Sequence, residues 1–341
     1  MMMIGSFWGK RNSAVLGLCV GIGLLTSHDV LAATRSDQLN VVVTIKPVHS
    51  LVQQVMEGLG TPALLVDGQA SPHTFALRPS DARALSGADV VVRVGPTVEA
   101  FTVKLAETLP SKTTLLTLVE APGVKLLETR RGSRFEAHDH DGADEKHDDA
   151  HDHGDKAQHA DHSDHDHEAS SMDGHIWLDP DNAKAIVRSV AAVLGERRPD
   201  LKDKLAANVD KAIADIDSLD VQVRADVAPI VDKPFVVFHD AFQYFEAHYG
   251  LHAAGSITLH PEVKPSARRL SEIRETVVQS GAHCVFTEPQ FSPRIVASVI
   301  EGSDAKAGTL DPLGANIPAG PNHYATLMRS LAVAMVGCLG G

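Results

Sequence analysis

The sequence predicts an α/β protein of two lobes, each built on a parallel sheet, with a long rigid helix between them. Short runs rich in branched apolar residues alternate with helical stretches, which is typical of a parallel sheet covered by helices. This alternation occurs on both sides of one long amphipathic stretch, residues 200–228. The length of 341 residues suits two domains, because one domain takes roughly 150 residues.

The amino terminus has the parts of a secretory signal peptide. The basic pair Lys10-Arg11 precedes a twelve-residue apolar run, Ala14–Leu25, and Val30–Ala32 places small residues at the two positions that a signal peptidase reads. A permanent bilayer anchor needs about 20 apolar residues, so this run is too short to serve as one. We therefore expect residues 1–32 to be removed by cleavage near Ala32 or Ala33.

The three cysteines predict a disulfide in the mature chain. Cys19 follows Leu18, whereas a lipoprotein signal has a small residue before its cysteine, so we expect no lipid anchor. Signal removal leaves Cys284 and Cys338, and an even pair outside the cytoplasm is more often a disulfide than two reactive thiols. The bridge would join the last helix to the strand that carries Cys284. Closing a loop of about 53 residues is worth roughly 4 kcal/mol in the chain-entropy model.

The first lobe, residues 33–199, is predicted from alternating strands and helices. Pro79-Ser80-Asp81 opens one helix, and Asp179-Pro180 supplies the cap and first turn of another that runs through Ala191. Residues 136–171 interrupt this pattern, and the ordered chain is expected to resume at Gly174–Leu178. The strands are expected at Val41–Ile45, Val90–Val94 and Leu115–Val119, and further helices at Ser50–Gly58 and Thr97–Thr108.

An acidic, His-rich insert, residues 136–171, interrupts the first lobe. Between Glu136 and Glu168 it holds thirteen acidic and two basic residues, a net charge of −11, while the whole chain carries −13. The rest of the mature chain is nearly neutral, which disfavours a nucleic-acid binder, because such a protein needs a basic face to neutralise phosphates. The insert has almost no branched apolar residue to bury, so we expect it to be disordered without a ligand.

The histidines of the insert indicate metal capture. Nine of the nineteen histidines of the chain lie there, and repeats such as His138-Asp139-His140 place imidazoles two residues apart among carboxylates. Flexible imidazoles bind ions with modest affinity, because ordering the chain costs entropy. A purely solvating acidic linker would explain the aspartates but not the histidines. The histidines of this accessory metal-capturing loop are His138, His140, His147, His151, His153, His159, His162, His165 and His167.

One amphipathic helix follows the first lobe. From Asp200 to Val227 apolar residues recur at steps of three and four, between Pro199 and Pro229. At 1.5 Å per residue this helix would be about 40 Å long. It could be a core helix of one lobe, but we favour a strut between two lobes because strands begin afresh after it. The second lobe, residues 229–341, has strands expected at Phe235–Phe238, Cys284–Thr287 and Ala307–Leu310.

Polar residues at the carboxyl ends of strands are the candidate ligand-binding groups, because open α/β sheets bind ligands there. His239, Glu288 and Asp311 each follow a predicted strand. His73 lies in a loop, and His175 begins the ordered run after the insert. The three histidines sit at element boundaries and fit a metal site assembled from both lobes.

Imidazole favours some metal ions over others. Neutral His suits zinc, copper, nickel or iron, whereas manganese or calcium would want more carboxylates. Spacing alone leaves other histidines available as ligands. These are His49, His248, His252, His260, His283 and His323.

Several long motifs in a consistent order carry a resemblance to a known family. They are His73–Asp81, Val94-Gly95-Pro96, His175–Leu178, Phe238–Phe242, Glu288–Phe291 and Thr309–Gly314. In these motifs the chain resembles the zinc-specific substrate-binding proteins of bacterial ABC importers, which work in the Gram-negative periplasm. The similarity covers nearly all the mature chain. The resemblance implies two α/β lobes joined by a long helix, a zinc ion in the cleft between them, and a His/Asp-rich loop before the second ligand.

The resemblance also implies the ligands. The three histidine ligands of the family fall on His73, His175 and His239. The manganese-binding branch typically has a carboxylate in place of His239, which favours zinc here. An aspartate that is the fourth ligand in that branch corresponds to Asp311, a possible fourth ligand, although water often takes this place in zinc-binding members. Some members have a Glu immediately before the first histidine, and this Glu can approach the metal. This chain has Pro72 at that position, so the role of the Glu is absent. The cysteine pair resembles a disulfide of the zinc-binding members.

The expected function is capture of Zn²⁺ in the periplasm and its delivery to an ABC permease in the inner membrane, by a monomer that is not an enzyme. An alternative in the same class is import of manganese or iron. A secreted zinc hydrolase is an alternative in another class, because zinc with three His and a water is also a catalytic arrangement. Against it, the chain lacks an H-E-x-x-H motif, and Glu288 is the one evident candidate base. A surface adhesin or metal-storage protein dominated by the insert is a further alternative.

Overall fold

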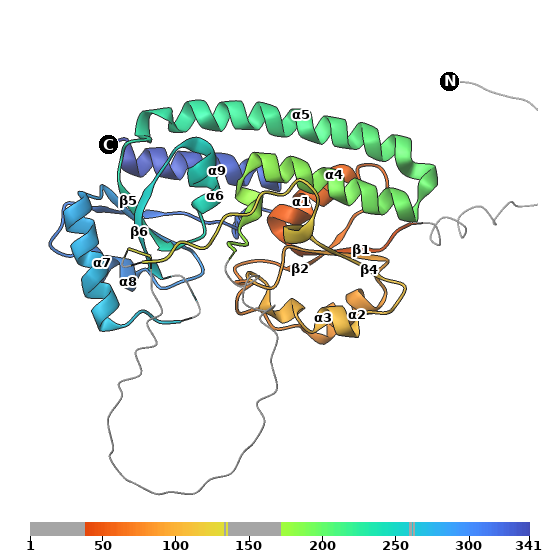
Figure 1. Cartoon of the computed structure of the whole chain (residues 1–341), viewed down its shortest axis with the longest axis horizontal. Coiled ribbons are helices and arrows are strands. Elements are labelled where there is room, and N and C mark those ends of the chain that lie inside the picture. Colours follow the sequence, from red (N-terminus) through yellow and green to blue (C-terminus); the bar gives the residue numbers. More distant parts are fainter. Residues whose placement is uncertain (1–37, 133, 136–171, 259–260, 262) are drawn as a thin grey trace, which may run out of the picture. The chain divides into compact units, whose positions relative to one another are not determined.

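The computed structural model describes residues 38–132, 134–135, 172–258, 261 and 263–341 (Figure 1). Within these ranges the chain forms two four-stranded parallel sheets with helices packed against them. The predicted signal peptide and the predicted insert, residues 1–32 and 136–171, lie outside the described residues.

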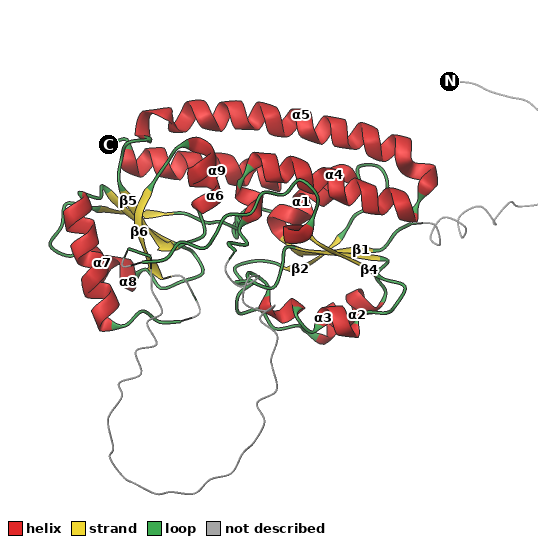
Figure 2. Cartoon of the chain, viewed as in Figure 1, coloured by secondary structure: helices red, strands yellow, loops and turns green. Residues whose placement is uncertain are grey.

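The first sheet has the strand order β2-β1-β3-β4. Figure 2 shows α1 and α4 over one face of it and α2 and α3 over the other. Every residue of β1 is buried, which is why the strand is apolar except for Thr44 and does not alternate. The elements are β1 (Val41–Ile45), α1 (Lys46–Val55), β2 (Ala63–Val66), α2 (Pro79–Ser86), β3 (Val90–Arg93), α3 (Leu105–Thr108), β4 (Thr114–Thr117) and α4 (Pro180–Arg197).

The second sheet has the order β6-β5-β7-β8. Side chains of β5 alternate between two cores. Val236 and Phe238 pack with apolar residues of α7 and α8, whereas Phe235 and Val237 join the larger core that includes α9. The elements are β5 (Phe235–His239), α6 (Gln243–Tyr249), β6 (Ala253–Thr258), α7 (Ala267–Ser280), β7 (Cys284–Thr287), α8 (Arg294–Ile300), β8 (Lys306–Thr309) and α9 (His323–Leu339).

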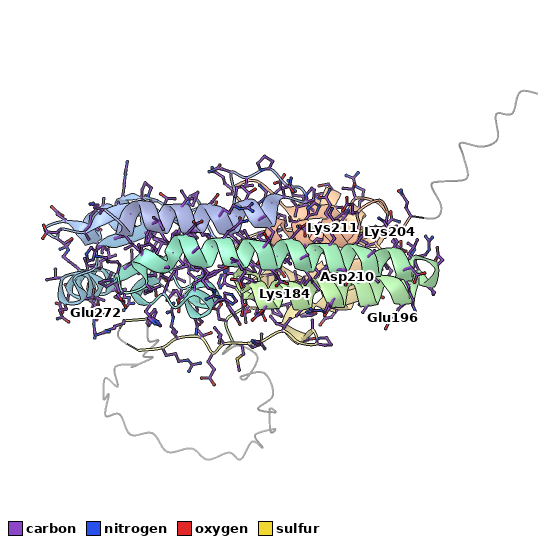
Figure 3. All side chains as sticks on the ribbon, turned by 90° about the horizontal axis from the view of Figure 1, so that it is seen from above. Lys184, Glu196, Lys204, Asp210, Lys211 and Glu272 are labelled. Atoms are coloured by element: carbon purple, nitrogen blue, oxygen red, sulfur yellow. A yellow bond between two sulfur atoms is a disulfide. The ribbon has the colours of Figure 1, made fainter. Side chains whose placement is uncertain are left out.

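The long helix α5 (Lys202–Val227) runs beside α4 and α9 (Figures 1 and 3). Its buried stripe follows the predicted apolar spacing and includes Leu205, Ile216 and Val227. Because α4 covers the first sheet and α9 packs on β8 of the second, α5 is in contact with both lobes. The predicted fold class is confirmed, while the exact limits of the two lobes stay predictions. No helix in the described ranges has the length and hydrophobicity that crossing a bilayer requires.

Two strands, and a break in one expected helix, were not predicted from the sequence. β2 has no β-branched residue before Val66, and β6 contains Gly255 and Ser256, so neither gives a strong strand pattern. The helix expected at 97–108 is split, because the buried Glu99 turns back to accept hydrogen bonds from the backbone of Val94 (2.8 Å) and Gly95 (3.2 Å). Glu99 itself therefore stays non-helical, and a short 3₁₀ helix, Ala100–Thr102, follows it.

The predicted disulfide between Cys284 and Cys338 is confirmed, with 6.2 Å between the two Cα atoms. It joins the first residue of β7 to the last turn of α9. The bridge thus lies at the amino end of β7, whereas Glu288 follows the carboxyl end of the same strand.

Candidate metal centre

The three predicted histidines come together between the two sheets. His73 lies in a turn between β2 and α2, His239 is the last residue of β5, and His175 precedes the short helix Ile176–Leu178. One ring nitrogen from each lies within 4.8 Å of those of the other two. The Nε2 atoms of His175 and His239 are 3.3 Å apart, and both side chains are buried. Three imidazoles from three distant segments therefore converge on one point.

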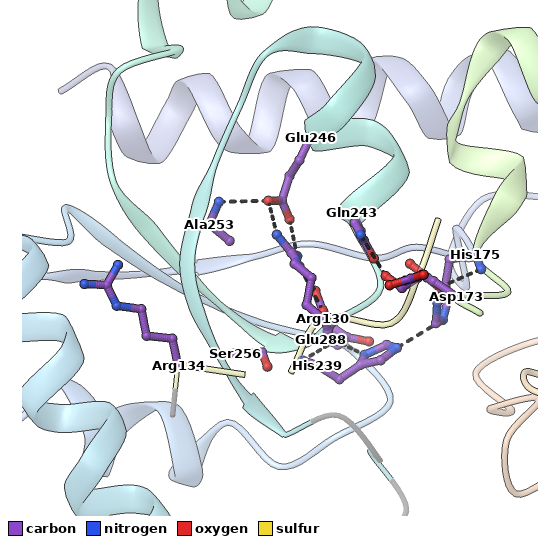
Figure 4. A network of polar contacts seen from close by, with 12 residues as sticks. Arg130, Arg134, Asp173, His175, His239, Gln243, Glu246, Ala253, Ser256 and Glu288 are labelled. Atoms are coloured by element: carbon purple, nitrogen blue, oxygen red, sulfur yellow. Dashed lines mark hydrogen bonds and ion pairs between the residues drawn. The ribbon is translucent and has the colours of Figure 1, made fainter. Parts of the chain in front are cut away.

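Asp173 fixes the ring of His175 (Figure 4). Its Oδ1 atom lies 2.7 Å from Nδ1 of His175 and also accepts a hydrogen bond from the His175 backbone N–H at 2.9 Å. A carboxylate at Nδ1 holds the proton on that nitrogen and leaves Nε2 as the metal-facing lone pair.

Glu288 does the same for His239. Its Oε1 atom lies 2.5 Å from Nδ1 of His239 and 3.3 Å from the backbone nitrogen (Figure 4). Burial lowers the pKa of His239, but the charge and hydrogen bond of Glu288, together with the charges of Asp240 and Asp173, leave this pKa above its ordinary value. Both rings thus present Nε2 to the common point, with a carboxylate behind each.

The space at the three histidines is small and has apolar walls. The cavity has a volume of about 10 Å³, which is room for about one water-sized group. Trp177 forms one wall: its ring centroid lies 5.3 Å from that of His175, and its Nε1 donates to the Pro312 carbonyl at 2.8 Å. Phe291 and Leu313 line it as well.

The comparisons with known proteins agree with one another. The model of the family described as "Zinc-uptake complex component A periplasmic", ZnuA, matches residues 41–338. The chain belongs to this family. It is 43% identical over 313 residues to the "High-affinity zinc uptake system protein ZnuA" of Brucella abortus, covering 90% of this chain and 94% of that protein. The protein of the same name from Paracoccus denitrificans is 36% identical over 332 residues, covering 97% and 99%.

A solved structure shares the fold. The "periplasmic zinc binding protein TroA" of Treponema pallidum superposes with a TM-score of 0.71 at 19% identity, over 89% of this chain and 99% of that one. The likeness extends over both sheets and the long helix of this ZnuA-family chain, and it concerns the fold alone.

Asp311, the possible fourth ligand, is not grouped with the three histidines in this ZnuA-family chain. Its carboxylate accepts hydrogen bonds from three successive backbone N–H groups, those of Leu313, Gly314 and Ala315, at 3.0, 3.0 and 2.6 Å. Gln290 Nε2 donates to the same carboxylate at 3.1 Å. The carboxylate thus caps the turn after β8 and faces backbone donors.

The other candidate histidines lie elsewhere. His49 is buried against the Pro62 carbonyl at 2.9 Å, and burial lowers its pKa. His323 Nε2 lies 2.9 Å from the Leu313 carbonyl oxygen. His252 and His283 are exposed. His260 and the nine histidines of the insert lie outside the described residues.

Sequence reasoning missed Asp173, the partner of His175. Its signal was the Asp-Gly-His spacing directly before the ordered run. The signal is weak, because Asp173 follows a stretch in which aspartate and histidine alternate throughout. Glu288 was predicted as a strand-end candidate and as a candidate base, but its role as the partner of His239 was missed, because nothing in the sequence links the two residues.

His248 forms a second cluster with two carboxylates. Its Nδ1 lies 3.0 Å from Asp179 Oδ1 at the start of α4, and its Nε2 lies 2.9 Å from Asp220 Oδ1 in α5. Asp181 also belongs to the cluster but pairs with Lys184 at 2.9 Å. The aspartates therefore have partners in the protein, and His248 acts as an ionic link from α6 to α4 and α5.

This link should make stability depend on pH. Burial lowers the pKa of His248, but hydrogen bonds and charge from Asp179 and Asp220 outweigh burial and raise it above its ordinary value. A raised folded pKa means that the contribution to stability is complete below about pH 6.5 and is lost as pH rises through the folded value. We expect His248→Gln to lower the free energy of unfolding by about 1–2 kcal/mol at pH 6, and by less at pH 9. Urea unfolding of both proteins at several pH values measures this; a difference that grows with pH would contradict it.

Proposed function

We propose that the chain is a periplasmic zinc-binding protein that captures Zn²⁺ and delivers it to an inner-membrane ABC permease. The observation that carries this proposal is the convergence of His73, His175 and His239, whose ligand nitrogens lie within 4.8 Å of one another. Zinc prefers such nitrogen ligands at tetrahedral sites. The names of the relatives in Brucella abortus and Paracoccus denitrificans support zinc as the transported ion.

Water is the fourth ligand in this proposal. Space for about one water-sized group lies beside the three histidines, and the oxygens of Asp311 are engaged by backbone N–H groups. Manganese would prefer more oxygen ligands than this centre offers, which disfavours the alternative of manganese import.

A binding role fits the centre better than hydrolysis. A hydrolase needs room beside the metal for a carbonyl substrate and a free base. The candidate base Glu288 is hydrogen-bonded to Nδ1 of His239 at 2.5 Å and is therefore not a free base. The chain is therefore a carrier whose ligand is the ion itself.

The disulfide and the amino-terminal pattern support export. A disulfide persists in an oxidising compartment such as the periplasm, and Cys284 and Cys338 form one. We propose that residues 1–32 are removed on export, and that the mature protein works as a monomer.

The insert is proposed as an accessory zinc-capturing loop. Its nine histidines raise the number of bound ions but do not form the tight site. The described residues that follow the insert, from Met172 onward, lead directly to Asp173 and His175.

Zinc titration of two proteins tests these roles. We expect the mature chain to bind one tight equivalent of zinc and several weaker ones, and a variant lacking residues 136–168 to keep only the tight one. Trp177 reports on the tight site, because its ring lies 5.3 Å from that of His175. Competition with a chelator of known affinity gives each dissociation constant. Loss of the tight equivalent on deletion would place the principal site in the insert and overturn the proposal.

A further inference from the structure

A strap, whose described residues are 125–132 and 134–135, runs from the first lobe to the second (Figure 1). It begins on α4, where the amide of Asn182 holds Lys125 by two hydrogen bonds. The Lys125 backbone N–H donates to Asn182 Oδ1 at 2.7 Å, and Asn182 Nδ2 donates to the Lys125 carbonyl at 3.0 Å. Asn182 is fully buried, so the origin of the strap is fixed to the first lobe.

The strap then meets the segment that carries His175. The backbone N–H of Asp173 donates to the Leu127 carbonyl at 2.8 Å. The hydroxyl of Tyr244, on α6, accepts from the Leu127 N–H at 3.0 Å and donates to the Asp173 carbonyl at 2.7 Å. One phenol of the second lobe thus joins the strap to the residue whose carboxylate orients His175.

Three residues further on, Arg130 binds the segment that carries His239 (Figure 4). Its guanidinium donates to the carboxylate of Asp240, the residue after His239, with Nε–Oδ2 at 3.0 Å. It also forms a paired contact with Glu246 on α6, at 2.8 and 2.9 Å. Both carboxylates are nearly inaccessible to solvent, with side-chain exposures of 4% and 3%. A planar guanidinium can bind each carboxylate through two donors in a fixed geometry, whereas an ammonium binds as a point charge.

The far end of the strap is fixed to the edge of the second sheet. The Arg134 carbonyl accepts from the Ser256 backbone N–H in β6 at 3.0 Å and from Arg269 Nη2 at 3.2 Å. Only glycine fits at position 255, because a Cβ there would lie 2.7 Å from the Arg134 oxygen. The Arg134 side chain itself is exposed and points away from this network (Figure 4).

We infer that this strap positions the two buried ligand histidines relative to each other, and that Arg130 is its principal positioning residue. The inference rests on the proposed function of the centre. Leu127 and Tyr244 hold Asp173 and thereby His175, while Arg130 holds Asp240 and thereby His239. The short separation of 3.3 Å between the two Nε2 atoms is maintained by these contacts across the lobe boundary. Arg130 binds no metal and acts through the histidines.

Four variants of the mature chain test the inference: Arg130→Met, Arg130→Lys, Tyr244→Phe and, as the matched control, Arg134→Met. We expect Arg130→Met to weaken the zinc dissociation constant about 10–100-fold, the range typical for loss of groups that orient ligands. Arg130→Lys keeps the positive charge but not the paired donors of the guanidinium. Its zinc dissociation constant should lie between those of Arg130→Met and the original chain. Arg134→Met should bind zinc as the original chain does.

A second readout separates positioning from general destabilisation. Co²⁺ bound at saturation gives visible absorption bands that report the geometry of its ligands. We expect these bands to change in Arg130→Met and Tyr244→Phe but not in Arg134→Met. Because the strap acts as one unit, the effects of Arg130→Met and Tyr244→Phe on zinc affinity should be less than additive in the double variant.

The outcomes test the proposed function and the role of the strap separately. Failure of the original chain to bind zinc tightly would overturn the proposed function. Tight binding by the original chain together with unchanged affinity and Co²⁺ bands in Arg130→Met would overturn the inference. Removing Arg130 leaves two buried carboxylates uncompensated. If Arg130→Met does not fold, Tyr244→Phe decides, and an affinity and Co²⁺ spectrum equal to those of the original chain would overturn the inference equally.

Discussion

His239→Ala is expected to weaken the tight zinc site by more than a hundredfold. Loss of a group that only orients a ligand costs about 10–100-fold, and His239 is proposed to donate its Nε2 lone pair to the ion itself. The change also leaves the buried Glu288 without its imidazole partner, because its Oε1 atom lies 2.5 Å from Nδ1 of His239. Chelator competition on the variant that lacks residues 136–168 measures the effect without the weaker equivalents.

Exposed histidines provide matched controls for this substitution. His252 and His283 belong to the same lobe but are exposed. Alanine at either position should leave the tight dissociation constant unchanged. Equal affinities for the original chain, His239→Ala and His252→Ala would remove His239 from the ligand set.

Loss of the disulfide is expected to have the largest effect on stability. Replacing Cys284 and Cys338 together by Ser opens a loop with a sequence separation of 54, which lowers the free energy of unfolding by roughly 4 kcal/mol in the chain-entropy model. Zinc affinity should stay nearly unchanged, because the bridge lies at the end of β7 opposite to Glu288. Denaturant unfolding of the zinc-free proteins measures the difference, and an unchanged midpoint would contradict the expectation.

The sequence was informative where one physical rule dominates. Buried parallel strands such as β1 are nearly continuous apolar runs, and the apolar residues of α5 recur at steps of three and four. His239 could be found because ligand groups in open α/β sheets follow the strands. The disulfide could be predicted from the number of cysteines in the mature chain and the expected oxidising compartment alone.

The remaining features depend on contacts between distant residues. β6 has a weak strand pattern because Gly255 must admit the carbonyl of Arg134, a residue 121 positions earlier. Arg130 is one of several arginines in a short stretch, and only folding shows that it alone faces Asp240 and Glu246. Asp173 is hidden among the acidic residues that precede it. Such groups have no periodic signal, because their partners are set by the packing of whole elements.

The two lobes are connected by more than the long helix. The strap links α4 to β6, and Lys46 of α1 donates to the carbonyls of Ala315 and Ile317 at 2.9 and 3.2 Å. The Lys46 contacts cross between the lobes, and Ala315 is two residues from Leu313, which lines the cavity at the three histidines. We therefore expect zinc uptake and release to involve small changes in the separation of the lobes.

X-ray absorption at the zinc edge tests the central claim most directly. The measurement uses the mature chain without residues 136–168, loaded with one equivalent of zinc. Three imidazole nitrogens and one oxygen, at about 2.0 Å, are the predicted coordination shell. A shell dominated by carboxylate oxygens, or one with fewer than two imidazoles, would contradict the assignment of His73, His175 and His239 as the zinc ligands.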